Sequence, residues 1–370
     1  MYYPIKIKES DITNIYEGAT VFSAVQNTLK DHFSHLNKKF ILVDENTRKH
    51  CLDSLVNYTP ALAGSTIIEI KSGEAQKNIE TVVSIWQQLS DGNAGRDAML
   101  VNLGGGVITD VGGFAAATYK RGIPYLNVPT TLVGMSDAAI GGKIAINLNN
   151  LKNQIGMFLL PRGTYIYSGF LRTLGRKDFL NGVAEIIKYG LIMDVGLFKK
   201  VSKLGVIQLL DQPFKDSLWD DLIRRTVKTK SEIIEKDFRD HKERRLLNFG
   251  HTIGHAFESY GMTENGEGLS RGHAVAMGII CESYLSGVKA GLKQDELNEI
   301  VALITSIFPV VPIESSAISG LMTIMKQDKK SSHGELQFTL IKAQGKAIIN
   351  QPIDDKLVRE SFEYYRTFIK

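Results

Sequence analysis

Residues 98–131 read AMLVNLGGGVITDVGGFAAATYKRGIPYLNVPTT, and this stretch decides the fold class. Two apolar runs, residues 98–103 and 124–128, are typical of buried strands. Residues 107–119 lie between them and have the pattern of a helix. A strand, a helix and a second strand in this order predict a parallel sheet with helices on both faces.

The same alternation extends upstream, and it ends downstream near residue 170. Upstream, residues 39–44 and 66–70 predict strands and residues 74–89 predict a helix. Downstream, long amphipathic patterns predict helices over residues 179–193, 218–237, 244–260, 273–290 and 294–307. A hairpin of residues 335–341 and 346–350, turning at Gln344-Gly345, and a last helix from about Asp354 follow. We therefore expect an α/β domain with a Rossmann-like parallel sheet over residues 1–170 and a mainly α-helical domain over residues 171–370.

Composition excludes several classes of protein. The 370 residues are 43% apolar and 23% charged, as in ordinary globular proteins. A net charge of +4 without a dense basic block does not favour a nucleic-acid partner. The N-terminal sequence lacks the apolar core of a secretory signal, and no long apolar run predicts a membrane span. Two distant cysteines, Cys51 and Cys281, form no disulfide framework, so we expect a reducing cytoplasm.

Three consecutive glycines, Gly104 to Gly106, separate the strand at 98–103 from the following helix. Without Cβ atoms, backbone N–H groups at a helix N-terminus approach a pyrophosphate closely. This pattern differs from the GxGxxG fingerprint, and a purely structural turn explains it equally well. Thr130 and Thr131 follow the next strand, where polar groups face a ligand crevice or simply mark the end of a strand.

Two helical patterns place ionisable side chains on one face. His251 and His255 are spaced i, i+4 in NFGHTIGH, and both could bind a metal, or one could bind it while the other moves protons. Glu185 and Lys188 are spaced i, i+3 on an otherwise apolar helix. They form either a surface ion pair or a carboxylate ligand beside a substrate-binding ammonium.

Further cations and amides precede or follow predicted elements, and each alone is a common surface feature. Together they would suit a phosphate and a carboxylate of an anionic small molecule. They are Arg121, Lys143, Lys152, Asn153 and Lys330, and Asp137 lies near two of the lysines and the Asn.

These segments, taken together, resemble the 3-dehydroquinate synthase family of sugar-phosphate cyclases. The resemblance runs from residue 44 to residue 330 and is carried by six stretches in order. They are GGGVITDVGGFAAATYKRGIPYLNVPTT (104–131), DAAIGGKIAIN (137–147), LKN (151–153), AEIIKYGLI (184–192), RRLLNFGHTIGH (244–255) and GHAVAMG (272–278).

The resemblance implies a role for each matching residue. It implies NAD contacts for Asp44, Glu74, Lys77, Gly105, Gly106, Asp110, Thr130 and Thr131. It implies catalytic roles for Lys188, His255, Asn248, Arg244 and Lys143, and substrate binding by Arg121, Asp137, Lys152, Asn153, Lys230 and Lys330. Lys143 and Lys152 match positions that hold either substrate or cofactor. Glu185 and His251 match two of three ligands of a divalent metal, zinc or cobalt.

The resemblance also implies a reaction and an assembly. The family converts 3-deoxy-D-arabino-heptulosonate 7-phosphate to 3-dehydroquinate and phosphate, a step of the shikimate pathway. NAD takes a hydride and later returns it, and the metal polarises the oxygen at the oxidised carbon. The family's members commonly form homodimers.

The sequence departs from the family pattern at the third metal ligand. The family has His-Gly-x-Ala-Val, and this chain has Arg271-Gly-His-Ala-Val275, so a cation without a free lone pair stands at the ligand position. Either His273 replaces the ligand through a local shift at the helix start, or Glu185, His251 and waters hold the metal weakly, or the activity has changed. Ile144 and Ser168 are milder departures.

Four functions therefore stay open. A 3-dehydroquinate synthase is the leading hypothesis, because the cationic set is nearly complete. A paralogous cyclase acting on sedoheptulose 7-phosphate or glucose 6-phosphate would differ at several of these residues. A non-catalytic NAD-binding homologue would bind ligands without turnover. A metal-dependent alcohol dehydrogenase would consume NAD and would not need so many phosphate-binding cations.

Overall fold

The computed structural model describes residues 2–6, 12–18, 20–149, 151–210, 216–260, 263–264, 267–328 and 336–368. The chain forms two compact units. The first unit comprises Met1–Phe179 and Lys215–Arg239, and the second comprises Leu180–Phe214 and Asp240–Lys370. Compared with a division at residue 170, the first unit also holds residues 171–179 and 215–239.

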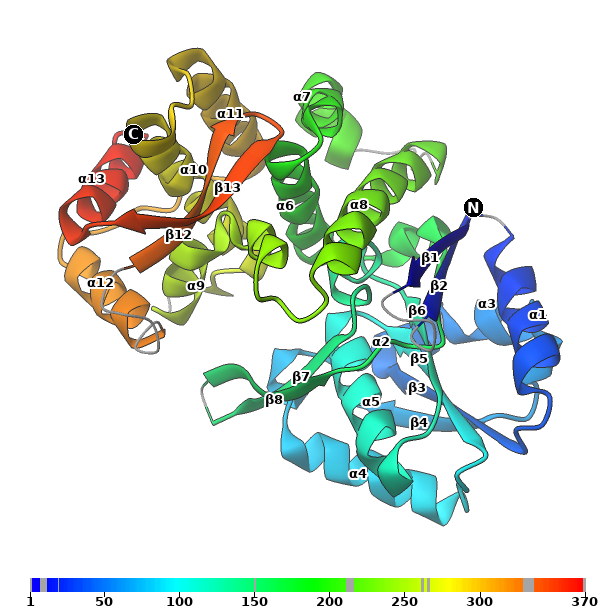
Figure 1. Ribbon diagram of the computed structural model, residues 1–370. Helices are drawn as coiled ribbons and strands as arrows, with labels where there is room; N and C mark the ends of the chain where they lie inside the picture. The colour runs from blue at the N-terminus through cyan, green and yellow to red at the C-terminus, as the bar shows by residue number, and fades with distance from the viewer. Residues whose placement is uncertain are drawn as a thin grey trace. The chain divides into compact units, whose positions relative to one another are not determined.

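The first unit is built on a seven-stranded sheet of order β1-β2-β9-β6-β5-β3-β4 (Figure 1). Its strands are β1 (Tyr2–Lys6), β2 (Ile12–Glu17), β3 (Lys38–Asp44), β4 (Thr66–Ile70), β5 (Ala98–Gly104), β6 (Tyr125–Pro129) and β9 (Gly163–Ile166). Only β1 runs antiparallel to its neighbour, so the predicted parallel sheet is confirmed. Every residue of β5, β6 and β9 is buried, and β5 and β6 correspond to the apolar runs at residues 98–103 and 124–128.

Helices α4 (Ile79–Asp91) and α5 (Gly106–Thr118) belong to the same hydrophobic core as this sheet. Val82 and Ile85 of α4 and Val111 of α5 are buried in one cluster with Phe40 of β3 and Leu100 of β5. The sequence pattern predicts both helices, although α4 begins at residue 79 and a short turn, η2 (Glu74–Gln76), precedes it. The packing fixes the end of β5 against the start of α5.

The other elements of the first unit surround this core, and a separate hairpin follows β6. The helices are α1 (Val21–Phe33), α2 (Glu45–His50), α3 (Leu52–Asn57) and α8 (Asp216–Lys236). Short turns are η1 (Pro60–Leu62), η3 (Tyr119–Arg121), η4 (Gly134–Ala138) and η5 (Ser168–Thr173). The hairpin pairs β7 (Lys143–Leu148) with β8 (Leu151–Phe158), and all residues of β8 are exposed.

The second unit is mainly helical, as predicted. Its helices are the greater part of α6 (Arg176–Ile192), then α7 (Val195–Leu210), α9 (His251–Ser259), α10 (Arg271–Ala290), α11 (Gln294–Ile307), α12 (Ala317–Asp328) and α13 (Asp355–Arg366). The turn η6 (Glu243–Asn248) precedes α9. The strand pairs are β10 (Thr263–Glu264) with β11 (Glu267–Gly268), and β12 (Leu336–Ala343) with β13 (Lys346–Ile353). The β12–β13 pair confirms the predicted hairpin.

Helix α10 is the central element of the second unit, and it contacts α9, α11, α13 and β12. Its contact with α9 is very close. A Cβ atom on Gly278 would lie 2.1 Å from the carbonyl oxygen of Gly250, and one on Gly254 would lie 3.0 Å from that of Ala274. These glycines therefore let the two backbones meet directly, which leaves little freedom in how α9 is placed on α10.

The predicted helix over residues 244–260 is wrong in one respect, because the structure divides it into η6 and α9. Gly250 lies between the two with a φ of 77°, a conformation that a side chain would disfavour. The break makes His251 the first residue of α9. No helix among the residues described has the length and apolar character needed to cross a membrane.

Candidate active site

The site residues predicted from the sequence fall into two groups, one in each unit. In the first unit, the glycine loop joins β5 to α5, and Gly105 precedes the helix in extended conformation. A Cβ atom on Gly104 would lie 2.4 Å from Ile108 Cγ1, and one on Gly105 would lie 2.8 Å from Thr131 Cγ2. Close packing thus accounts for these glycines. The loop also leaves α5 without a side-chain cap from any described residue, so its N-terminal N–H groups face outward from the helix end.

Thr130 and Thr131 lie directly beside this loop. The N–H of Thr130 donates to the carbonyl of Gly104 at 3.1 Å, which ties the end of β6 to the end of β5. The hydroxyl of Thr131 accepts a hydrogen bond from the N–H of Gly134 at 3.1 Å. The ends of the two strands therefore bring the glycines and both threonines together, as expected at the carboxyl edge of a parallel sheet.

A polar network around the buried side chain of Lys77 joins four more of the predicted residues. Lys77 Nζ is 2.5 Å from Asp110 Oδ2 and donates to Asn153 Oδ1 at 2.6 Å. Asn147 Nδ2 donates to Glu74 Oε1 at 3.0 Å, and Asn147 Oδ1 accepts from the N–H of Asn153 at 2.9 Å. The network links η2, α5 and the β7–β8 hairpin. Asn147 has no predicted role, yet it bridges two residues that do.

Tyr125 lies beneath the same region at the start of β6. Its hydroxyl donates to the carbonyl of Leu159 at 2.7 Å. Burial, with the nearby Asp110 carboxylate as a smaller cause, raises the pKa of Tyr125. The phenol therefore stays protonated and serves as a structural donor.

Asp44 follows β3 and caps α2. Its Oδ1 accepts the N–H of Thr47 at 2.8 Å, and its own N–H donates to Thr47 Oγ1 at 2.9 Å. This reciprocal pair is a capping box, which fixes the orientation of the carboxylate at the carboxyl end of the strand. The sequence D-x-x-T is the local signal for this cap, a structural role for Asp44 beside the cofactor role that the resemblance implies.

Asp137 and Lys230 meet within the first unit. Lys230, on α8, is 5% exposed, and its Nζ donates to Asp137 Oδ1 at 2.7 Å and to the Asp137 carbonyl at 2.6 Å. Asp137 lies in the π-helical turn η4. The remaining predicted residues of this unit, Arg121, Lys143 and Lys152, are exposed, and Arg121 has a φ of 70°.

In the second unit, Glu185 and Lys188 form an ion pair on α6, with 2.6 Å between Glu185 Oε2 and Lys188 Nζ. Each side chain is only 1% exposed. The pair is thus buried, and of the two interpretations of this spacing the solvent-exposed pair is excluded. A buried ion pair needs further polar neighbours to offset its desolvation.

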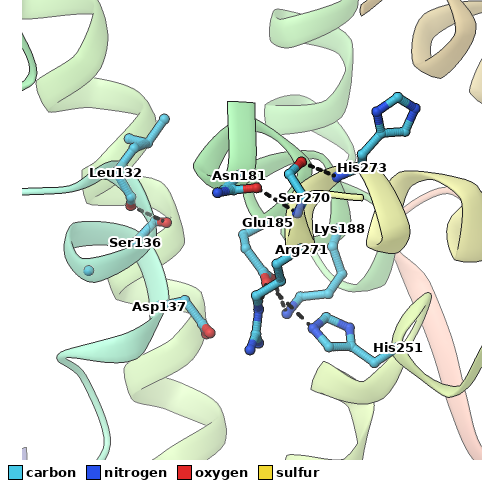
Figure 2. Close-up of polar contacts among 12 residues, drawn as sticks. Leu132, Ser136, Asp137, Asn181, Glu185, Lys188, His251, Ser270, Arg271 and His273 are labelled. Carbon is cyan, nitrogen blue, oxygen red and sulfur yellow. Dashed lines mark hydrogen bonds and ion pairs between the residues drawn. The ribbon is translucent and has the colours of Figure 1, made fainter. Parts of the chain in front are cut away.

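His251 faces the other oxygen of this carboxylate (Figure 2). Its Nε2 is 3.4 Å from Glu185 Oε1, and its Nδ1 is 3.1 Å from the carbonyl oxygen of Phe249. Because a carbonyl only accepts, this geometry assigns the ring proton to Nδ1 and leaves a lone pair on Nε2 in the neutral ring. His255 is exposed one turn later, with its ring centroid 5.4 Å from that of His251.

The carboxylate of Glu282, on α10, fixes the start of α9. It accepts the N–H of Gly250 at 2.7 Å and that of Ile253 at 3.0 Å, and Glu282 is fully buried. A carboxylate at a helix N-terminus is stabilised by the helix dipole as well as by these bonds. Glu282 therefore positions His251, a role that no local sequence signal indicates.

Arg271, the first residue of α10, also reaches Glu185. Its Nε is 3.7 Å from Glu185 Oε1, and its side chain is 38% exposed. The neighbouring backbone is held tightly, because the Gly272 N–H donates to Asn181 Oδ1 at 2.7 Å and a Cβ on Gly272 would lie 2.4 Å from Asn181 Cα. Figure 2 shows Arg271, Lys188 and His251 converging on Glu185.

His273 does not join this cluster, which corrects the expectation of a local shift at the helix start. Ser270 caps α10 through the N–H of His273, and the helix is regular from Arg271 onward. Two positions along a helix is too far around it to share a face. The His273 ring points away from Glu185 (Figure 2), and its Nε2 is 2.5 Å from the carbonyl oxygen of Pro309.

Three other predicted residues complete the account of this unit. Arg244 and Asn248 lie on η6, just before the Gly250 break, and the first is buried while the second is exposed. Lys330 lies outside the described residues.

Glu185 and His251 fit two positions of a divalent metal site. Bonds of 2.0–2.2 Å at a tetrahedral angle separate neighbouring ligand atoms by about 3.4 Å, and Glu185 Oε1 and His251 Nε2 are 3.4 Å apart. The carbonyl behind His251 is the kind of partner that orients a metal-binding imidazole. Across the part of the chain that the structure describes, however, no three His, Cys, Asp or Glu side chains are grouped to hold a metal. Beside Glu185, Lys188 and His251, the fourth side chain at the cluster is the cation of Arg271.

Comparison with known proteins gives a consistent family. Residues 67–181 match the model of the 3-dehydroquinate synthase N-terminal domain, and residues 182–331 match that of its C-terminal domain. The chain is 40% identical over 344 residues to the 3-dehydroquinate synthase of Parabacteroides distasonis, covering 92% of this chain and 96% of that protein. It is 34% identical over 339 residues to that of Pyrococcus furiosus, with coverage of 91% and 96%.

Solved structures with a similar fold include two synthases, and alcohol dehydrogenases match with lower scores. A 2-deoxy-scyllo-inosose synthase in complex with carbaglucose-6-phosphate, NAD+ and Co2+ has a TM-score of 0.85 at 22% identity, covering 99% of both chains. The 2-epi-5-epi-valiolone synthase of Streptomyces hygroscopicus, with NAD+ and Zn2+ bound, has a TM-score of 0.82 at 26% identity, covering 96% of this chain and 97% of that one. The two family models and the similar relatives indicate one family, and the fold is consistent with it. The chain belongs to the 3-dehydroquinate synthase family.

Proposed function

We propose that this chain is a 3-dehydroquinate synthase, a carbon–oxygen lyase that converts 3-deoxy-D-arabino-heptulosonate 7-phosphate to 3-dehydroquinate and phosphate. It would recycle NAD and use a divalent metal, zinc or cobalt. The observation that carries the proposal is the buried Glu185–Lys188–His251 cluster, which combines two metal ligands with an ammonium inside a helical unit. Family membership supports the same reaction.

When bound, NAD would supply reversible hydride acceptance, and the metal, held by Glu185 and His251, would polarise the oxygen at the oxidised carbon. The first unit would bind the dinucleotide. The N-terminus of α5 and the glycines before it suit a pyrophosphate, and the capped carboxylate of Asp44, at the end of β3, suits a ribose hydroxyl. Thr130 and Thr131 would line the same edge.

The cationic residues would hold and orient the substrate. Lys188 and Lys230 are both buried and each is fixed by a carboxylate, so their ammonium groups are positioned before substrate arrives. A phosphate dianion and a carboxylate need several such donors. Arg121, Lys143, Lys152, Arg244 and Lys330 would supply the others.

His255 would hold and move a proton. Its ring is exposed beside His251 on α9, and imidazole titrates near neutral pH. Asn248 would assist by hydrogen bonding to the same group.

The protein would also form a homodimer and lie in the cytoplasm. Sedimentation tests the oligomeric state, and cell fractionation tests the location. The two cysteines are buried thiols, as a reducing compartment permits.

The test is phosphate release from 3-deoxy-D-arabino-heptulosonate 7-phosphate by the full chain with catalytic amounts of NAD. Reactions are run after chelation and after addition of Zn2+ or Co2+. We expect metal-dependent release of phosphate without net formation of NADH. Sedoheptulose 7-phosphate and glucose 6-phosphate serve as comparison substrates.

Three results would contradict the proposal. Release from one of the comparison substrates alone would identify a paralogous cyclase. Binding of NAD without turnover at saturating metal would identify a non-catalytic homologue. Accumulation of one NADH per substrate would instead indicate a dehydrogenase.

A further inference from the structure

The carboxylate of Glu185 has more neighbours than one metal site needs. Its Oε2 pairs with Lys188 Nζ at 2.6 Å. Its Oε1 faces His251 Nε2 at 3.4 Å and Arg271 Nε at 3.7 Å (Figure 2). One oxygen is thus engaged by an ammonium, and the other is shared between an imidazole lone pair and a guanidinium.

A metal ion and Arg271 need the same oxygen. Glu185 Oε1 and His251 Nε2 are spaced as two ligands of one tetrahedral ion. A guanidinium stays charged and offers no lone pair, so it repels an ion at this position and cannot ligate it. Catalytic zinc sites usually have three protein ligands, and the described residues of this cluster provide two.

The backbone holds Arg271 at the cluster. Asn181 accepts the Gly272 N–H at 2.7 Å, and Gly272 packs against the Asn181 backbone without room for a Cβ atom. The nearby imidazole of His273 is directed to the carbonyl of Pro309. The side chain of Arg271 is 38% exposed, so it has space to swing away from Glu185 when an ion binds.

We propose that Arg271 sets the metal affinity of this site by competing with the divalent ion for Glu185, and that Glu185 and His251 are the only side chains among the described residues that hold the ion. The inference rests on the proposed function only for the presence of a metal. Its consequence is a weakly held, readily exchanged ion whose binding requires displacement of the Arg271 guanidinium. Arg271 is then a positioning residue that acts through Glu185.

The experiment compares metal affinity in the full chain after chelation, by titration with Zn2+ and Co2+ in competition with a chromophoric chelator. Arg271→Met removes the competing charge without adding a ligand, and we expect it to tighten binding about 10-fold. Arg271→His removes the charge and adds a ligand, and we expect it to tighten metal binding about 100-fold or more. Even residues that contact a metal only through its ligands alter its affinity by about 10–100-fold.

Two variants serve as controls. Arg366→Met removes an arginine that pairs with Glu363 on α13, outside the cluster, and should leave metal affinity unchanged. His273→Asn should also leave it unchanged, because the His273 ring faces Pro309. Equal affinity of the unaltered chain and Arg271→Met overturns the competition, and a large loss in His273→Asn overturns the two-ligand site.

The titrations do not require turnover, so the inference and the proposed function fail separately. Tight metal binding by an unaltered chain that releases phosphate would overturn the inference alone. A second outcome is that the unaltered chain binds metal weakly, that Arg271→His tightens this binding, and that the protein is inactive at saturating metal. This outcome would overturn the proposed function and support the inference.

Discussion

Glu185 is the residue that Lys188, His251 and Arg271 all approach in the second unit. Its i, i+3 spacing from Lys188 made their contact predictable from the sequence, and the resemblance predicted His251 as a neighbour. The approach of Arg271 and the support of Asn181 were not predictable. They depend on how the start of α10 packs on α6, and no local spacing encodes a contact between distant helices.

Replacing Lys188 by Met should abolish phosphate release while NAD binding is retained. Removing one partner of a buried ion pair commonly costs about 3–5 kcal/mol, because the remaining charge stays buried. We expect a loss of that order in Lys188→Met, measured by urea unfolding. The double variant Glu185→Gln, Lys188→Met should lose less stability, because no uncompensated charge remains. Equal losses of unfolding free energy in the two proteins would show that Lys188 is not paired as described. Loss of NAD binding in Lys188→Met would contradict a role of Lys188 in substrate binding.

The elements of the chain were predictable to different degrees. The partly buried strand β4 and the amphipathic helix α11 have the predicted bounds, because each has a sequence pattern that is typical of its type of element. The β7–β8 hairpin and the break at Gly250 went unpredicted. In the hairpin, β8 is exposed along its whole length and therefore has no burial pattern. The break interrupts an otherwise continuous helical pattern by the backbone conformation of one residue.

The contact between α9 and α10 depends on Gly278. Gly278→Ala should destabilise the protein by about 1–3 kcal/mol, because the new methyl group meets the Gly250 carbonyl and overpacks the contact. The same change should weaken metal binding, since it displaces the start of α9.

Gly287→Ala is the matched control on α10, where no atom lies closer than 3.7 Å to the added carbon. Its better helix propensity should stabilise the protein by up to about 1 kcal/mol. Thermal unfolding of both variants measures the contrast, and the same sign for both would contradict the packing argument.

The cap on α9 gives a second test at the level of elements. Glu282→Gln keeps the shape of the side chain and removes one acceptor and the charge, so we expect a loss of about 1–3 kcal/mol and weaker Zn2+ binding. Glu299→Gln, at an exposed acceptor of Gln344, should change neither property appreciably. Unchanged metal affinity in Glu282→Gln would show that the cap does not position His251.

At the scale of the whole molecule, the division into two units was only partly visible in the sequence. The change from alternating strands and helices to helices alone indicated an α/β part and a helical part. The return of residues 215–239 to the first unit was not predictable, because the pattern of α8 resembles that of any amphipathic helix. Which surface such a helix covers is decided by tertiary packing.

Each unit contains one cysteine, and both thiols should be unreactive in the folded protein. Burial raises the pKa of Cys51 to about 12 and that of Cys281 well above its usual value. Thiolate is the reactive form, so iodoacetamide at pH 8 should label neither residue. In guanidinium chloride both should be labelled, and peptide mass spectrometry would report the opening of each unit separately. Labelling of Cys51 in the native protein would contradict its burial.

Because the first unit is made of two separated pieces of chain, it cannot be completed during synthesis until residue 239 has left the ribosome. Helix α8 contributes Trp219, which packs on Phe179 with 4.7 Å between ring centroids, and Lys230, which holds Asp137. A fragment ending at residue 179 would lack both and would expose the surface that α8 covers. Expression of the first unit alone would therefore require residues 215–239 to be joined to residues 1–179. The order of translation thus obliges the nascent chain to begin the second unit before it has finished the first.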